Sequence, residues 1–231
     1  MDPLHGSAWS TPEMVAGFAK SSPNETLMAF AGHLLMAGGR VAIDIGCGAG
    51  RNLVPLAQQG WSIAGVDLSK PMIERAAARI RDESVQHGAS VALAAMDALP
   101  FRDAVADLVI AHGIWNLARS STQFRRAVRE AARVTRDGGS LFLFTFSRHT
   151  VAGSASPVPG EPFVFTEFSG EPQCFLTREQ LIDELRAVEF EPDSAVPLTE
   201  HNLPRPGAVM TQRVPVIWEA TFRWQGRRIA S

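Results

Sequence analysis

The chain has 231 residues, of which 45% are hydrophobic and 20% are charged, and its formal net charge is −2. This length suits one large α/β domain and would leave two separate domains small. The near-neutral charge argues against a nucleic-acid-binding surface, which needs a clear basic excess. Two cysteines, Cys47 and Cys174, exclude a disulfide scaffold and cannot alone build a cysteine-rich zinc site, so we expect no metal.

No membrane span is expected, because the sequence contains no uninterrupted apolar run of about 18 residues. The first ten residues, "MDPLHGSAWS", lack the basic start and the apolar stretch of a secretory signal. We therefore expect a cytoplasmic protein without a membrane partner.

The first 40 residues predict two helices, in residues 11–20 and 22–39. Thr11 and Ser22 are each followed by proline, which is typical of a helix cap and a first helical position. From residue 41 onward, short apolar runs alternate with helical segments. Strands are predicted within residues 41–45, 61–69, 89–100, 105–115 and 140–147. Helices are predicted in residues 51–60, 70–88 and 121–139.

This alternation predicts an α/β fold with a doubly wound, Rossmann-like and mostly parallel sheet, covered by helices on both faces. Residues 147–176 are rich in Pro, Gly, Ser and Phe and are too long for an ordinary connection. A helix with a capping box from Thr177 to Gln180 follows, and then a strand within residues 190–200. The closing strand comes after a loop rather than a helix, so it is predicted to be antiparallel. The complete sheet would then have seven strands.

Three glycines, Gly46, Gly48 and Gly50, follow the first strand, at the sheet edge where open parallel sheets bind ligands. Glycine permits a positive φ and lets the backbone approach a ligand closely. The dinucleotide fingerprint G-x-G-x-x-G would need a further glycine where this sequence has Arg51. The glycines alone leave two ligands open, a dinucleotide and a nucleoside that carries an amino acid.

Carboxylates end the next two strands, with Asp67 in "GVDLS" and Asp97 in "AMDALP". Together with "DIGCGAGRN" and "ADLVIAHGIWNL", these motifs resemble the class I S-adenosylmethionine-dependent methyltransferases over residues 40–146. They look most like the small-molecule branch, which includes the ubiquinone/menaquinone-type (methyltransferase type 11) and tellurite-resistance-type enzymes. The resemblance implies a methyltransferase domain over residues 41–231 and a helical lid over residues 1–40. Residues 147–176 and 201–213 would be an insert and a loop on the substrate side.

The resemblance also implies roles for particular residues. Asp44 would order the glycine loop and the amino-acid end of the cofactor, and Asp67 would hold its ribose, although a carboxylate there equally suits a nicotinamide cofactor. Asp97 would bind the adenine, or alternatively cap the local turn. The complete set of expected cofactor contacts is Asp44, Gly46, Cys47, Gly48, Asp67, Leu68, Met96, Asp97, Ala98 and Ala111. Cys47 is also interpreted more simply as a small turn residue.

Methyl transfer from a sulfonium needs alignment and exclusion of water more than it needs a universal catalytic residue. His112, directly after the fourth strand, is the candidate general base, since an ordinary imidazole pKa of about 6.5 suits proton removal at neutral pH. The alternative is that His112 only makes local hydrogen bonds. Trp115 and Asn116 would line the same opening, unless Trp115 packs under the next helix. Arg205, in the 201–213 loop, would meet an acidic acceptor.

The expected function is therefore transfer of a methyl group from S-adenosylmethionine to an oxygen, nitrogen or sulfur atom of a small molecule, with S-adenosylhomocysteine as product. A protein that binds the nucleoside without catalysis is one alternative. An NAD(P)-dependent oxidoreductase is another, disfavoured by Arg51 and by a sequence without tyrosine. Acceptor and oligomeric state stay open.

Overall fold

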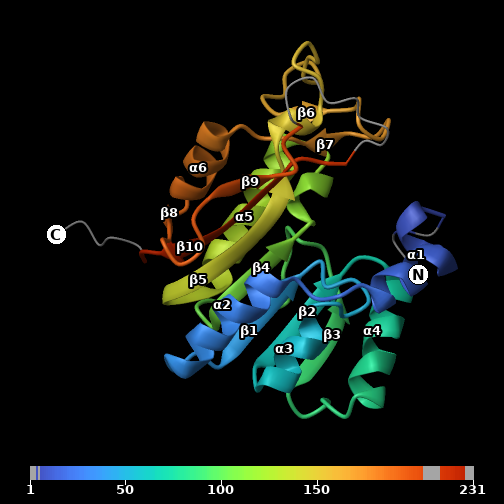
Figure 1. Ribbon diagram of the computed structural model, residues 1–231, viewed down its shortest axis with the longest axis vertical. Coiled ribbons are helices and arrows are strands. Elements are labelled where there is room, and N and C mark those ends of the chain that lie inside the picture. The colour runs from blue at the N-terminus through green and yellow to red at the C-terminus, as the bar shows by residue number, and fades with distance from the viewer. Residues whose placement is uncertain (1–3, 5, 205–213, 227–231) are drawn as a thin grey trace.

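The computed structural model describes residues 4, 6–204 and 214–226, and it is built around one mixed sheet (Figure 1). The spatial order of the strands is β3-β2-β1-β4-β5-β10-β8, and β9 also pairs with β10. The strands of this sheet are β1 (Val41–Ile45), β2 (Ser62–Asp67), β3 (Ala89–Leu93), β4 (Ala106–His112), β5 (Thr135–Phe146), β8 (Phe190–Pro192), β9 (Thr199–His201) and β10 (Ile217–Trp224). The helices are α1 (Pro12–Lys20), α2 (Glu25–Met36), α3 (Leu53–Gln59), α4 (Lys70–Asp82), α5 (Ser121–Val134) and α6 (Arg178–Arg186).

The predicted topology is confirmed. Strand β1 pairs in parallel with β2 and β4, β2 pairs in parallel with β3, and β4 pairs in parallel with β5. The closing strand β10 runs antiparallel to β5. On its other edge, β10 pairs with both β8 and β9, so these two short strands share one position and the sheet has seven positions, as predicted.

The prediction of one strand within residues 190–200 is wrong in detail, because pairing stops after Pro192 and resumes only at Thr199. Between the two pieces, Thr221 of β10 bonds both Asp193, whose amide donates to the Thr221 carbonyl at 2.9 Å, and Val196, whose carbonyl accepts from the Thr221 amide at 2.9 Å. The residues between them therefore bulge out of the ladder and divide the strand. Helix α5 is also shorter than predicted. It ends at Val134, because Thr135 already pairs with Ala106 of β4.

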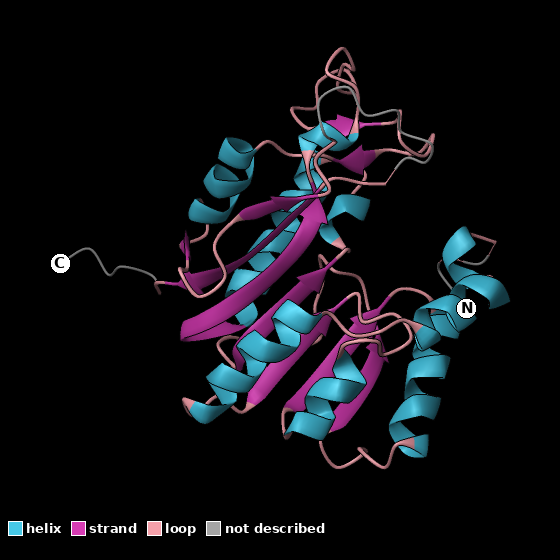
Figure 2. Ribbon diagram, viewed as in Figure 1, coloured by secondary structure: helices cyan, strands magenta, loops and turns pink. Residues whose placement is uncertain are grey.

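Helices cover both faces of the sheet, as Figure 2 shows. Side chains of a strand alternate between the two faces, and β4 illustrates this. Leu108 and Ile110 pack in the core under α2 and α3, whereas Val109 and Ala111 pack in the core under α5 and α6. All four side chains are fully buried. The apolar run of β4 therefore has the pattern of a strand buried on both faces.

Two segments lie outside this layered core. The 3-10 turn η1 (Ala8–Ser10) and α1 pack on α4 near the N-terminus. Residues 147–176 form the 3-10 turn η3 (Arg148–Thr150) and a separate two-stranded sheet, β6 (Val164–Phe165) with β7 (Gln173–Cys174), which Figure 1 shows beyond the arrowhead of β5. Every helix in the described residues is too short or too polar to cross a membrane.

Most helix caps follow local sequence signals. Thr11, Ser69 and Thr177 each accept a hydrogen bond from the backbone amide two or three positions into the helix, and the capping box of α6 is present as predicted. The predicted cap of the second helix, Ser22, is wrong. Asn24 is the cap of α2, because its Oδ1 accepts a hydrogen bond from the Leu27 amide at 2.8 Å.

Candidate functional site

The turn after β1 can be built only from glycine at its first position. Gly46 has φ +73°, and a Cβ at this position would lie 2.6 Å from a side-chain carbon of Ile114. The amides of Gly46 and Cys47 both donate to the carbonyl of Val66, at 2.7 and 3.0 Å. The turn is therefore pinned to the end of β2, with its backbone at the carboxyl edge of the sheet.

Asp67 is brought directly against this turn, as predicted from its place at the end of β2. Its Oδ2 accepts a hydrogen bond from the Gly48 amide at 2.9 Å, and its Oδ1 accepts one from the Ser69 amide at 2.8 Å. Ser69 in turn caps α4. These bonds fix the carboxylate beside the glycine turn and next to the half-buried Leu68. Carboxylate oxygens can accept more than one hydrogen bond, so a ribose diol can also be bound here.

Asp44 lies near the end of β1 and is the most unusual group of the site. Its side chain is 1% exposed, and its Oδ2 has no hydrogen-bond partner among the described residues. Burial, and then the nearby charge of Asp67, raise the pKa of Asp44 to about 8, while the Arg51 guanidinium opposes this shift. A buried carboxylate oxygen without a donor is costly, so this position fits a ligand that brings a cationic N–H group.

Arg51 is a site residue that the sequence analysis used only to exclude a dinucleotide. Its Nε donates to the carbonyl of Ser22 at 2.6 Å, which ties the α1–α2 connection to the glycine turn. Its charge acts on both Asp44 and His112 and lowers the pKa of each. The sequence does contain a signal that could have identified Arg51 as a site residue: it is a cationic residue directly after a glycine turn, and the strand before this turn carries the acid Asp44.

The predicted adenine-binding segment is placed near α5. The Asp97 carboxylate forms an ion pair with Arg126 of α5 at 2.8 Å, rather than capping its own turn. The amide of Ala98 donates to the carbonyl of Ala95, and Met96 packs against the core. A ligand that used the Asp97 carboxylate would have to share it with Arg126.

Two other predicted cofactor residues have side chains in the core. The sulfur of Cys47 would lie 2.7 Å from a Cβ built at Gly65, so the thiol points toward β2 and away from the sheet edge. Burial raises its pKa well above the ordinary value, which is not the behaviour of a nucleophile. This placement favours the interpretation of Cys47 as a small turn residue. Ala111 is fully buried in β4, so both residues offer a ligand only their backbone.

His112 ends β4 next to the glycine turn. Its ring stacks on Phe144 of β5, with centroids 4.1 Å apart and planes at 9°. Its Nε2 lies 3.3 Å from the side-chain amide nitrogen, Nδ2, of Asn24. Burial, and then the charge of Arg51, lower the pKa of His112 to about 4. The expected pKa near 6.5 is therefore wrong, and the imidazole is neutral at physiological pH.

The candidate acceptor-side residues have different outcomes. Trp115 is completely buried and meets Phe124 of α5 edge-on at 5.9 Å, which favours the alternative that it packs under that helix. Asn116 is also buried, and its Oδ1 lacks a partner in the described part of the chain. Arg205 lies outside the described residues. Glu219 of β10 is a further buried residue of this cluster that was not predicted. Its Oε1 accepts a hydrogen bond from the side-chain amide of Asn24 at 2.7 Å.

The fold is that of a Rossmann-like domain, and the candidate site lies at the carboxyl edge of its sheet. A family model described as "Methyltransferase domain" matches residues 43–143. Demethylmenaquinone methyltransferase of Mycobacterium tuberculosis is 34% identical over 178 residues, which are 73% of this chain and 66% of that protein. The chain belongs to the class I S-adenosylmethionine-dependent methyltransferase family. No comparison distinguishes the tellurite-resistance-type branch within that family.

Other relatives match shorter parts. Methyltransferase GfsG of Streptomyces halstedii is 29% identical over 62% of this chain and 50% of that protein. The ubiquinone/menaquinone biosynthesis C-methyltransferase UbiE of Acidiphilium cryptum is 33% identical over 50% of this chain and 45% of that protein. The chain thus spans about half the length of these curated relatives.

Solved structures support the fold. A methyltransferase from Methanosarcina mazei has a TM-score of 0.65 at 18% identity and covers 88% of this chain and 99% of its own. The 1,6-didemethyltoxoflavin-N1-methyltransferase of Burkholderia thailandensis, solved with S-adenosylhomocysteine, has a TM-score of 0.61 at 20% identity. The match covers 87% of this chain and 79% of that chain.

Proposed function

We propose that this chain binds S-adenosylmethionine at the carboxyl edge of β1, β2 and β4 and transfers its methyl group to a small molecule. The proposal rests above all on Asp44. This carboxylate is buried, and its Oδ2 has no donor among the described residues. The ammonium group of the cofactor's methionine end would supply that donor. A Cβ at Gly48 would meet no heavy atom nearer than 3.9 Å, so the backbone of the turn is open to the methionine end at this glycine.

The other cofactor contacts follow from the same edge of the sheet. The charge of Arg51 already acts on Asp44, which would pair with the ammonium group of the methionine end. The Arg51 guanidinium would therefore hold the carboxylate of that same end. Asp67, with Leu68 beside it, would accept the ribose hydroxyls. The adenine would lie against the segment from Met96 to Ala98, with the Asp97 carboxylate shared between the base and Arg126.

When bound, the cofactor supplies a methyl group on a sulfonium, which is an activated leaving group. The work left to the chain is to align the acceptor with this methyl and to exclude water. His112 ends β4 beside the glycine turn, so it would border the transferred methyl group.

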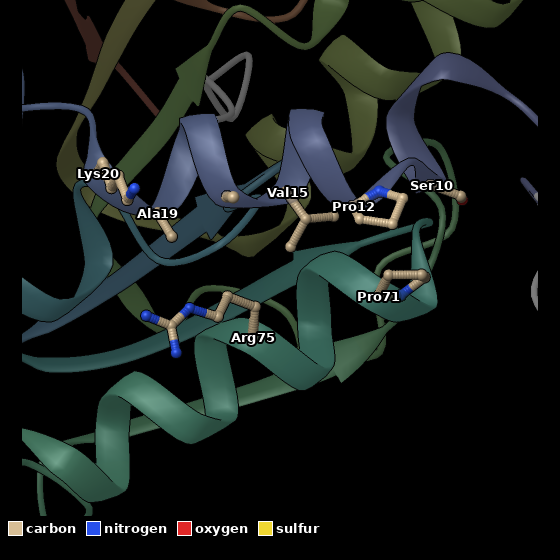
Figure 3. A pocket seen from close by; sticks show the side chains of 8 residues that line it. Ser10, Pro12, Val15, Ala19, Lys20, Pro71 and Arg75 are labelled. Carbon is tan, nitrogen blue, oxygen red and sulfur yellow. The ribbon is translucent and has the colours of Figure 1, made fainter.

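We propose that the N-terminal segment acts as a lid. All nine residues of α1 are described, and none is buried. Phe18 packs against Trp9 and would be 3.9 Å from a Cβ at Gly48, so it lies over the glycine turn. Where α1 packs on α4, a cavity of about 480 Å³ lies between them, and Figure 3 shows Val15 and Ala19 of α1 on one side of it and Pro71 and Arg75 of α4 on the other. A helix that buries none of its own residues can leave the turn at low cost.

The acceptor is proposed to be a small molecule rather than a nucleic acid. The net charge of −2 disfavours a polyanion. Relatives are named for demethylmenaquinone and 1,6-didemethyltoxoflavin, which are small molecules. The relative from Acidiphilium cryptum is named a C-methyltransferase, and the one from Burkholderia thailandensis is named an N1-methyltransferase. Carbon is therefore a candidate nucleophile in addition to oxygen, nitrogen and sulfur.

Calorimetric titration with S-adenosylmethionine, S-adenosylhomocysteine and NAD tests the proposal. We expect both sulfur nucleosides to bind in the micromolar range and NAD not to bind. Binding of NAD alone would overturn the proposal. A screen of small-molecule acceptors with a labelled methyl donor then separates an enzyme from a protein that only binds the nucleoside.

A further inference from the structure

The side-chain amide of Asn24 lies between His112 and Glu219. Its nitrogen is 3.3 Å from Nε2 of His112 and 2.7 Å from Oε1 of Glu219. The orientation of the amide is fixed from its other end, because its oxygen caps α2 by accepting the Leu27 amide at 2.8 Å. The NH₂ group therefore points to the imidazole and the carboxylate.

This orientation determines where the proton of His112 resides. An amide NH₂ group is only a donor, so the Nε2 that faces it must act as an acceptor. A neutral imidazole with an accepting Nε2 carries its proton on Nδ1. In a protonated ring, Nε2 would also carry a hydrogen. That N–H group would point at the NH₂ group of Asn24, which is itself only a donor.

The surroundings of His112 act in the same direction. Strand register places His112, Phe144 and Glu219 side by side across β4, β5 and β10, so their side chains share one face. Stacking on Phe144 fixes the plane of the ring. The charged or titratable groups that face this cluster are Arg51 from the turn before α3, Glu219 from β10 and, behind it, His201 from β9, at 3.4 Å from Glu219. Arg51 disfavours a second positive charge on His112.

Capping alone does not explain asparagine at position 24. Serine, threonine and aspartate also cap helices well, through an oxygen that accepts the backbone amide. Only asparagine adds an NH₂ group that can donate to two acceptors at once. The backbone amide of Asn24 also donates to the side chain of Asn52 at 3.0 Å, directly before α3. Asn24 thus links the glycine-turn side of the site to β4 and β10.

We propose that Asn24 and Glu219 are positioning residues that hold His112 as a neutral imidazole with its proton on Nδ1. Glu219 anchors the amide, the amide occupies Nε2, and His112 borders the site without serving as a general base. The inference rests on the proposed function for its role in methyl transfer. It implies that the acceptor atom reaches the methyl group with its lone pair already available, or loses its proton to a group other than His112.

Long-range proton–nitrogen NMR spectra of the histidine side chains test this in the full-length protein without any acceptor. His112→Gln identifies the signals of His112 by their loss. In the wild type we expect His112 to stay neutral, with the proton on Nδ1, from pH 5.5 to 8. Asn24→Asp keeps the cap but replaces the donor with an acceptor carboxylate, so His112 should titrate at least one pH unit higher than in the wild type. Asn24→Ser keeps a cap without adding charge, and should lose the fixed tautomer. Glu219→Gln removes the charged anchor of the amide and should weaken the fixed tautomer as well.

The matched control is Asn202→Asp, because the Asn202 side chain is exposed and bonds only the Pro215 carbonyl among the contacts described. It should leave His112 unchanged. A wild-type His112 that titrates near pH 6.5, carries its proton on Nε2, or ignores Asn24→Asp in a folded variant overturns the inference. Titration of the same samples with S-adenosylhomocysteine tests the proposed function separately. A protein that fails to bind it refutes that function while the state of His112 remains measurable.

Discussion

Binding of the cofactor should release a proton from Asp44, and the affinity should therefore depend on pH. With a pKa of about 8, only about one tenth of Asp44 is ionised at pH 7 and about one hundredth at pH 6. The ammonium group of the cofactor needs the ionised carboxylate. Its binding lowers the pKa of Asp44, and the proton leaves.

The magnitude follows from this ionised fraction. Below pH 8, each unit of pH changes the fraction about tenfold, which corresponds to about 1.4 kcal/mol of binding free energy. The affinity for S-adenosylhomocysteine should rise about tenfold from pH 6 to pH 7 and level off above pH 8. Close to one proton should be released per molecule bound at pH 7.

Calorimetry in two buffers of different ionisation enthalpy counts this proton, and the control is Asp44→Asn. This variant keeps the size of the side chain but has no proton to release, so its affinity should be lower and independent of pH between 6 and 8. Loss of the charged hydrogen bond should weaken binding by about 1.5–3 kcal/mol. An affinity that is flat with pH in the wild type, or that varies equally in Asp44→Asn, would refute the role assigned to Asp44.

Three further predictions concern neighbouring positions. Asp67→Ala should weaken binding of S-adenosylmethionine by about 1.5–3 kcal/mol if the carboxylate holds the ribose, and an unchanged dissociation constant would contradict that role. Gly46→Ala should lower the free energy of unfolding by about 1–3 kcal/mol, since its methyl group meets Ile114 and φ is positive. Gly153→Ala is the control in denaturant titrations, because nothing in the described residues lies within 4 Å of that Cβ, and equal effects would exclude the steric explanation. Phe18→Ala should speed dissociation of S-adenosylhomocysteine in stopped-flow measurements, and unchanged rates would argue against a lid.

Proximity in the sheet decides which site contacts could be predicted from the sequence. Gly48 follows β1, and Asp67 ends the neighbouring parallel strand β2. The carboxyl ends of these strands meet at one edge, and the bond between the two residues is present. The ion pair of Asp97 with Arg126 was missed, since it depends on which face of α5 packs against the turn after β3. Both residues are visible in the sequence, but the rotation of the helix is not.

The cluster around Asn24 was beyond sequence reasoning for a stronger reason. Asn24 and Glu219 are 195 residues apart, and their contact depends on the antiparallel register of β10 and on the start of α2 above it. The pKa of His112 was mispredicted for the same cause, because its burial and its distance from Arg51 are set by packing. Local signals therefore gave the fold and the glycine turn, while tertiary packing determined the proton chemistry of the site.

The division of one outer strand into β8 and β9 has a consequence for how the molecule behaves among its own copies. An unbroken strand at the border of a sheet offers a row of free amide and carbonyl groups, to which another chain can add a strand. Here that border consists of two pieces of three residues each, with Pro197 in the interval between them. Neither piece is long enough to template an added strand. The interruption that made the strand hard to predict protects this side of the sheet against aggregation through strand pairing.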